Sequence, residues 1–94
     1  MSDKVLHELA DKLAADTLKA MDALGDDRLY EQVAAVLGAS SQTSEEAYLT
    51  SMRIRLAERR GRAFLNDYVK EAIQAKKEGR EVALTAPTID NEDL

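Results

Sequence analysis

The feature that most constrains this chain is the stretch 44–78, in which Gly61 is the only residue that strongly disfavours a helix. The stretch is rich in Ala, Leu, Glu, Arg and Lys, which are good helix formers, and Gly79 directly follows it. We therefore predict one helix over about 44–78, about three times as long as the mean helix of globular proteins. A kink near Gly61 is the one interruption that the composition favours.

An amphipathic helix is predicted over about 3–24. Apolar residues recur there at steps of three and four, and charged residues fill the opposite side. Gly25 is expected to end this helix, because glycine is the usual residue after a helix C-terminus. Asp26 and Asp27 then form a turn that caps the next helix.

A short helix over about 28–37 is predicted to end at Gly38, and a loop over residues 39–43 is predicted to follow it. The loop consists of Ala, Ser, Ser, Gln and Thr, most of which favour turns. Thr43 and Glu46 have the spacing of a capping box, which places the start of the third helix at about residue 44.

The three helices predict an all-α fold with a single helical domain over residues 1–79. The chain has 94 residues, which suffices for one domain and leaves room for only a small core. Past Gly79 the helical periodicity ends, and the one Pro lies among Thr, Asp, Asn and Glu. Residues 80–94 are therefore predicted to be a flexible acidic tail.

The third helix carries two apolar stripes when its residues are projected at about 100° per residue. The first consists of Leu49, Met52, Leu56 and Ala63. The second consists of Ile54, Ala57, Gly61, Leu65, Tyr68, Ala72 and Ala75. The two shorter helices can cover one stripe, which leaves the other for a kinked-back segment of the chain or for another copy. We expect a homo-oligomer with a seam at Ile54, Ala57, Gly61, Leu65, Tyr68 and Ala72, and a local kink at Gly61 is the alternative.

No arrangement of residues in the sequence points to catalysis. The chain has no Cys, and its one histidine, His7, lies on the polar side of the first helix without further metal ligands or a nucleophile. The acidic pairs 26–27 and 45–46 lie at helix starts, where the helix dipole accounts for them. The four glycines are spread singly, so no phosphate-binding loop is expected. We predict no enzyme activity, no metal and no cofactor.

The charge distribution singles out a basic belt. Residues 1–52, 53–80 and 81–94 carry net charges of −6, +5 and −4. Arg55, Arg59 and Arg62 line up on one side of the third helix, at steps of four and three. Guanidinium groups in such a row are suited to contacting the phosphates of a nucleic acid. The alternative is a solvated face that Glu58 partly neutralises.

Residues 33–48 resemble a degenerate helix-turn-helix. The residues that carry the resemblance, in the first helix and turn of the motif, are Val33, Ala34, Leu37 and Gly38. The sequence departs from the pattern in the recognition helix, because Ser44 replaces its apolar anchor. Glu45 and Glu46 moreover occupy positions expected to face the major groove, where phosphates repel carboxylates.

In overall layout the chain resembles the small terminase subunits of tailed phages and related elements. That family combines a helix-turn-helix, a helical oligomerisation element and a C-terminal tail that binds a partner. The resemblance implies a ring-forming protein that handles DNA and passes it to a larger motor through the tail. It also implies Arg55, Arg59 and Arg62 as the DNA contacts.

The end of the chain is a candidate docking peptide, because acids alternate with apolar residues beyond a Pro. Its residues are Ile89, Asp90, Glu92, Asp93 and Leu94. An ordinary solubilising terminus is the alternative reading of this segment.

Together these features predict a non-enzymatic interaction protein that self-associates through its third helix and docks a protein partner through the tail or the basic belt. A nucleic-acid-binding protein is the alternative, and an inhibitor that mimics nucleic acid through the acidic residues 1–52 is a third class. No apolar stretch approaches the roughly 20 residues of a membrane span, and the N-terminus lacks the apolar core of a signal peptide. We therefore expect a cytoplasmic protein without membrane contact.

Overall fold

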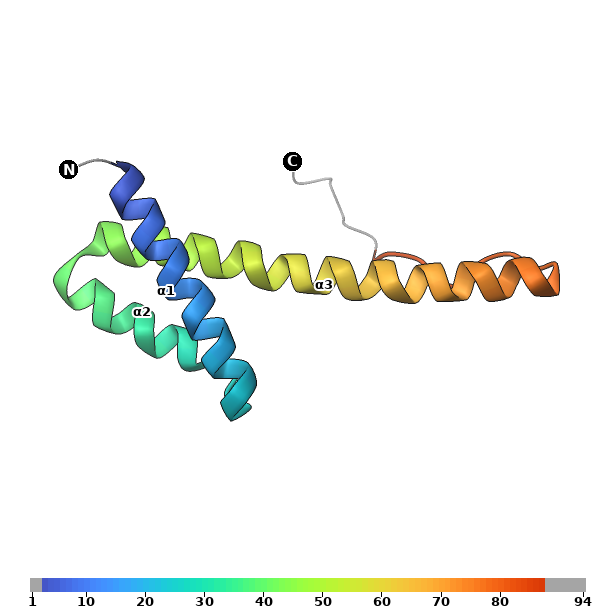
Figure 1. Ribbon diagram of the computed structural model, residues 1–94, viewed down its shortest axis with the longest axis horizontal. Helices are drawn as coiled ribbons and strands as arrows, with labels where there is room; N and C mark the ends of the chain where they lie inside the picture. The colour runs from blue at the N-terminus through green and yellow to red at the C-terminus, as the bar shows by residue number, and fades with distance from the viewer. Residues whose placement is uncertain (1–2, 88–94) are drawn as a thin grey trace. The chain divides into compact units, whose positions relative to one another are not determined.

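The computed structural model describes residues 3–87 and contains three helices, α1 (Asp3–Leu24), α2 (Leu29–Ser40) and α3 (Gln42–Glu78) (Figure 1). No strand occurs among residues 3–87, so the predicted all-α class and the order of three helices with a long third one are confirmed. The chain divides into two compact units, which we call the first unit (Met1–Ala57) and the second unit (Glu58–Leu94). Residues of α3 belong to both.

The end of α1 follows the prediction. Gly25 has a φ of 67°, which residues with a side chain rarely adopt, and its N–H donates to the carbonyl of Met21 at 2.9 Å. The Asp26 carboxylate then accepts a hydrogen bond from the Arg28 N–H at 2.9 Å, which stabilises the turn into α2. The predicted capping of α2 by Asp26 and Asp27 is wrong, because Arg28 occupies the N-cap position and no side chain caps the helix there. The Arg28 side chain pairs with Glu31 at 2.8 Å in the first turn of that helix.

The predicted end of the second helix at Gly38 is wrong. Helix α2 continues to Ser40, and Gly38 is one of its helical residues. A lone glycine in a helix costs only about 1 kcal/mol, so it ends a helix only where the chain also takes a positive φ. Among residues 3–87 only Gly25 and Gly79 do so. A Cβ at Gly38 would meet the Glu45 carboxyl group at 2.8 Å, so the missing side chain allows Glu45 to lie against α2.

The predicted loop over residues 39–43 is a single residue, Ser41, and the capping box at Thr43 and Glu46 is not formed at a helix start. Ser41 has extended backbone angles, and its hydroxyl oxygen accepts a hydrogen bond from the Ser44 N–H at 3.1 Å. That geometry is an N-cap, so α3 begins at Gln42, two residues earlier than expected.

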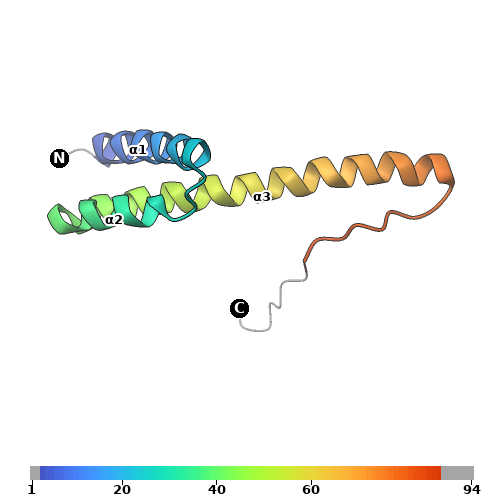
Figure 2. The same ribbon diagram turned by 90° about the horizontal axis from the view of Figure 1, so that it is seen from below.

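The core of the first unit is formed where the three helices meet. Figure 2 shows α2 and the first turns of α3 on one side and α1 on the other, and Figure 1 shows that α1 crosses α3 obliquely. The buried apolar residues of this core are Ala10, Ala14, Leu18, Met21, Ala34, Tyr48 and Met52. Three of the seven are alanines, which let the helices approach closely. Leu49 and Leu56 pack partly buried against them, so most of the first predicted stripe faces this core.

One hydrogen-bond network ties the three helices together. The Tyr48 hydroxyl on α3 shares its one proton between two acceptors, the Thr17 Oγ1 on α1 at 3.3 Å and the Tyr30 carbonyl on α2 at 3.2 Å. The Thr17 hydroxyl in turn donates to the Leu13 carbonyl at 2.8 Å. Burial raises the pKa of Tyr48 above its ordinary value of 10.0, so the hydroxyl keeps its proton at neutral pH and remains a donor.

The second unit consists of the later turns of α3 and the segment after them. Residues 58–78 are helical, including Gly61. Gly79 has a φ of 68°, the Arg80 N–H donates to the Ala75 carbonyl at 3.0 Å, and the Gly79 N–H donates to the Lys76 carbonyl at 3.3 Å. This pair of bonds is a Schellman motif, which reverses the chain direction. Residues 80–87 then run back beside α3 without regular secondary structure (Figures 1 and 2).

Candidate functional site

The segment 80–87 is held on α3 by two carboxylates, Glu71 and Glu78. The Arg80 guanidinium makes a two-pronged contact with Glu71, with distances of 2.6 Å from Nη1 to Oε2 and 3.0 Å from Nη2 to Oε1. Its Nε also donates to Glu78 Oε1 at 2.7 Å. The Ala83 N–H donates to Glu71 Oε2 at 2.7 Å. Paired guanidinium–carboxylate bonds of this kind fix the relative orientation of the two groups in addition to pairing their charges. The returning segment therefore has a defined register on the helix.

These contacts shift the pKa values of both carboxylates. The hydrogen bonds from Arg80 and then from the Ala83 N–H lower the pKa of Glu71 to about 2. The bonds from Arg80 and from Gln74 lower the pKa of Glu78 below its ordinary value. The carboxylates likewise raise the pKa of Arg80. All three groups are therefore fully charged at neutral pH.

The returning segment covers one edge of the helix. Ala75 is 1% exposed, and Val82 of the segment is half-buried. The Glu71 side chain is only 18% exposed. Ala75, which we placed on the second apolar stripe, is thus shielded by the chain itself and not left for a partner.

An adjoining side of α3, which includes three residues of that stripe, remains uncovered. Leu65, Val69 and Ile73 are 53%, 46% and 52% exposed, and Tyr68 is 38% exposed. Ala72 between them is half-buried. We call these five residues the α3 face: Leu65, Tyr68, Val69, Ala72 and Ile73. Their spacing of i, i+3, i+4, i+7 and i+8 is that of a helix side which packs against another element. Within residues 3–87, however, no other element of the chain covers the α3 face.

The α3 face contains three residues of the predicted seam, Leu65, Tyr68 and Ala72. Val69 and Ile73 were missed, although with Leu65 they form a row at steps of four that a wider projection of the helix would have included. The Phe64 and Tyr68 rings lie 5.9 Å apart at the edge of this face.

The other predicted seam residues lie elsewhere. Ile54 and Ala57 belong to the first unit, where Ile54 is 64% exposed. Gly61 is exposed, and a Cβ on it would meet no atom within 4 Å. No neighbouring backbone of this chain therefore requires a glycine at this position. The structure does not test whether a second copy approaches at Gly61, and that part of the seam stays a prediction.

The arginines predicted to contact nucleic acid are engaged with neighbouring groups. Arg55 donates to the Ser51 hydroxyl at 3.2 Å and to the Asp11 carbonyl on α1 at 3.3 Å. Arg62 pairs with Glu58 at 2.7 Å, and Arg59 also makes an interaction. A phosphate would have to compete with these contacts, and phosphate binding by the three arginines remains a prediction.

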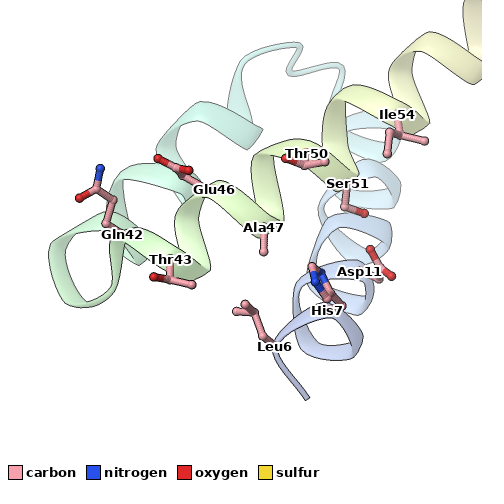
Figure 3. A pocket seen from close by; sticks show the side chains of 10 residues that line it. All are labelled: Leu6, His7, Asp11, Gln42, Thr43, Glu46, Ala47, Thr50, Ser51 and Ile54. Atoms are coloured by element: carbon pink, nitrogen blue, oxygen red, sulfur yellow. The ribbon is translucent and has the colours of Figure 1, made fainter. Parts of the chain in front are cut away.

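A cleft lies between α1 and the first turns of α3, with a volume of about 500 Å³. Figure 3 shows Leu6, His7 and Asp11 on the α1 side of it. The α3 side is lined by Gln42, Thr43, Glu46, Ala47, Thr50, Ser51 and Ile54. We call this hollow the α1–α3 cleft. Sequence reasoning did not find it, since it depends on how the two helices pack.

The α1–α3 cleft combines apolar surface with acidic groups. Leu6, Ala47 and Ile54 supply the apolar part. The Asp11 and Glu46 carboxylates lie on opposite sides, and neither takes part in an ion pair or side-chain hydrogen bond within the described residues. His7 is exposed at the rim, as expected of a surface histidine.

Two further features concern metals and membranes. Within residues 3–87 no group of three or more His, Cys, Asp or Glu side chains is arranged to hold a metal ion. None of the three helices described within residues 3–87 has an apolar stretch of the length that spanning a bilayer requires. His7 therefore has no ligand cluster around it in the described structure.

The segment that resembled a helix-turn-helix lacks the expected turn. The resemblance required a turn at Gly38, whereas residues 38–40 are helical and Ser41 alone separates α2 from α3. Ala34 is 4% exposed, as the small residue of such a motif would be, but it belongs to the core of the first unit. The predicted docking peptide, Ile89 to Leu94, lies outside the described residues.

Comparison with protein-family models, with curated proteins and with solved structures found no match to this chain. Within residues 3–87 the α3 face and the α1–α3 cleft are two distinctive surfaces of the protein.

Proposed function

We propose that this protein is a non-enzymatic interaction protein that self-associates through the α3 face. The observation that carries the proposal is the row of half-exposed Leu65, Val69 and Ile73 beside Tyr68, spaced as one packing side of a helix. Contiguous apolar surface of this kind on a small protein marks an interaction site. Single exposed apolar residues, by contrast, are normal and carry no such meaning.

The strength of the association follows from the exposed area. Full burial of a Leu, Ile or Val side chain contributes about 1.5–3 kcal/mol, so each half-exposed residue of the face gains about 1 kcal/mol on contact. A handful of such gains on each side, about 10 kcal/mol in all, exceeds by about 6 kcal/mol the low end of the roughly 4–15 kcal/mol lost in translational and rotational freedom. A net gain of about 6 kcal/mol corresponds to a dissociation constant of tens of micromolar, so we expect weak self-association.

Self-association leaves other surfaces for a protein partner. The candidates are the basic belt around Arg59 and the acidic segment from Ile89 to Leu94, as the sequence suggested. In this proposal the assembly presents several copies of one weak docking element, which raises the effective affinity for a partner.

The test is sedimentation velocity of the full chain between about 1 and 200 μM, a range set by the expected affinity. The wild type should shift to a larger species as concentration rises. Val69→Glu should remain a monomer, because a carboxylate would be desolvated at the contact. The matched control is Ala35→Glu, which places the same charge at an exposed position of α2 outside both the α3 face and the α1–α3 cleft and should associate like the wild type. A wild type that stays monomeric throughout this range would overturn the proposal.

A further inference from the structure

The proposed self-association leaves open what the α3 face packs against. We infer that the α3 face of one copy occupies the α1–α3 cleft of a second copy, in a head-to-tail contact. The inference rests on the proposed function and assigns the occupant of both surfaces. The apolar shape and the bordering charges of the α3 face are complementary to those of the α1–α3 cleft.

The apolar parts of the two surfaces are complementary in form. The α3 face is a convex row of large side chains, and the α1–α3 cleft is a hollow of about 500 Å³ with Leu6, Ala47 and Ile54 in its lining. A volume of this size lies within the usual range of binding cavities. Entry of the row would also cover Ile54, one of the most exposed large apolar residues of the first unit.

The charges at the edges of the two surfaces are also complementary. Lys70 and Lys77 lie three residues before and four residues after Ile73, so both border the α3 face on the same side of the helix. Neither makes an ion pair within residues 3–87. The cleft carries the unpaired carboxylates of Asp11 and Glu46. Exposed lysines that border an apolar row fit a cleft whose walls are acidic.

A face-to-face pairing of two α3 faces lacks this match. It would bring Lys70 and Lys77 of both copies to one contact, where like charges repel. Two carboxylates of the second unit near the α3 face are already engaged, since Glu58 pairs with Arg62 and Glu71 pairs with Arg80. The same contrast holds for the whole units: residues 3–57 carry ten acidic and six basic side chains, and residues 58–87 carry five acidic and seven basic ones.

The experiment reverses the charges of each surface in full-length protein. The cleft variant carries Asp11→Lys and Glu46→Lys, and the face variant carries Lys70→Glu and Lys77→Glu. All four positions are exposed, so circular dichroism and the thermal midpoint should stay close to those of the wild type. Each variant alone should associate about tenfold more weakly than the wild type, because two ion pairs become like-charge contacts.

A 1:1 mixture of the two variants is the decisive arm. It restores opposite charges at every cleft-to-face contact between unlike copies, so association in the mixture should return to the wild-type strength. A control variant with Asp16→Lys and Asp27→Lys, two exposed acids outside the cleft, should associate like the wild type and gain nothing from mixing. If a variant is unstable, the neutral pair Asp11→Asn and Glu46→Gln serves in its place, with a smaller loss expected.

Two results would overturn the inference. In one, the cleft variant associates like the wild type while Val69→Glu does not, which keeps self-association through the α3 face but excludes the cleft as its partner. In the other, the mixture remains as weak as the separate variants. A monomeric wild type is a different outcome, because it removes the proposed function itself.

Discussion

The two units use the same helix in opposite ways. In the first unit α3 buries Tyr48 and Met52 completely beneath α1 and α2. In the second unit the same helix leaves Leu65, Val69 and Ile73 about half exposed. Both segments have apolar residues at helical spacing, so the pattern alone does not decide burial. What decides it is whether another element of the chain lies against that side.

The units also differ in what holds them together. The first unit has a small apolar core and a hydrogen-bond network that joins all three helices. The second unit has the helical backbone, the Schellman turn at Gly79 and the contacts of Arg80 and Ala83 with Glu71. A core of packed side chains and a set of exposed ion pairs and hydrogen bonds respond differently to substitution and to pH. Each difference in response can be measured.

The largest expected effect is that of Met52→Ala in the first unit. Met52 is fully buried, so its truncation removes apolar contacts and leaves a cavity, which lowers the free energy of unfolding by about 2–4 kcal/mol. The counterpart Ile73→Ala should lower it by less than about 0.5 kcal/mol in dilute protein, because the side chain is exposed. Urea denaturation at concentrations below self-association measures both. Equal losses would show that the second unit has a core of its own.

A smaller effect is expected from Tyr48→Phe, which removes one hydroxyl from the network between the helices. The Tyr30 carbonyl loses its donor, and the free energy of unfolding should fall by about 1–1.5 kcal/mol. Tyr68→Phe is the matched control in the second unit, where the ring is partly exposed, and should change stability by less than about 0.5 kcal/mol. A loss at Tyr68 as large as that at Tyr48 would contradict the difference between the units.

Gly61→Ala should raise stability by up to about 1 kcal/mol, because alanine is the better helix former and its Cβ would meet nothing within 4 Å. Gly38→Ala should gain less, since its Cβ would push the Glu45 carboxyl group away from α2. Thermal unfolding measures both. If Gly61→Ala instead weakens self-association in sedimentation velocity, the predicted seam includes Gly61 after all.

The smallest expected effect is confined to residues 80–87 and depends on pH. The pKa of Glu71 is about 2 on the helix and rises towards its ordinary value of 4.5 when the segment is released. Because the pKa is lowered by docking, the docked state is favoured fully above about pH 4.5 and loses that advantage as the pH falls towards 2. The Ala83 amide resonance should follow this transition, while resonances of the first unit should not.

Glu71→Gln tests the origin of that transition. The amide cannot carry the charge that Arg80 pairs with, so the Ala83 resonance should resemble that of the released segment at neutral pH and show no further change between pH 5 and 2. Glu81→Gln is the control, because Glu81 is exposed and its side chain makes no contact with Arg80 in the described structure. A retained transition in Glu71→Gln would assign it to another carboxylate.

Much of the fold was predictable because its signals are local. The helical stretches of α1 and α3 follow from apolar periodicity and helix-forming composition, and the stops at Gly25 and Gly79 coincide with positive φ angles. Gly38 was misjudged because a glycine ends a helix only when the backbone changes direction there. The sequence around Gly38 does not show that the chain stays helical for two more residues and that Ser41 supplies the cap.

What the sequence by itself determined, then, is the helical class, the order of the helices and the presence of two apolar stripes on α3. Tertiary structure alone decided which stretches of those stripes are covered, that Glu71 binds both Arg80 and Ala83, and that Asp11 and Glu46 line one cleft. The physical reason is the distance along the chain over which each effect acts. Helix formation depends on residues a few positions apart, whereas burial and charge pairing depend on which side of each helix meets a segment distant in the chain.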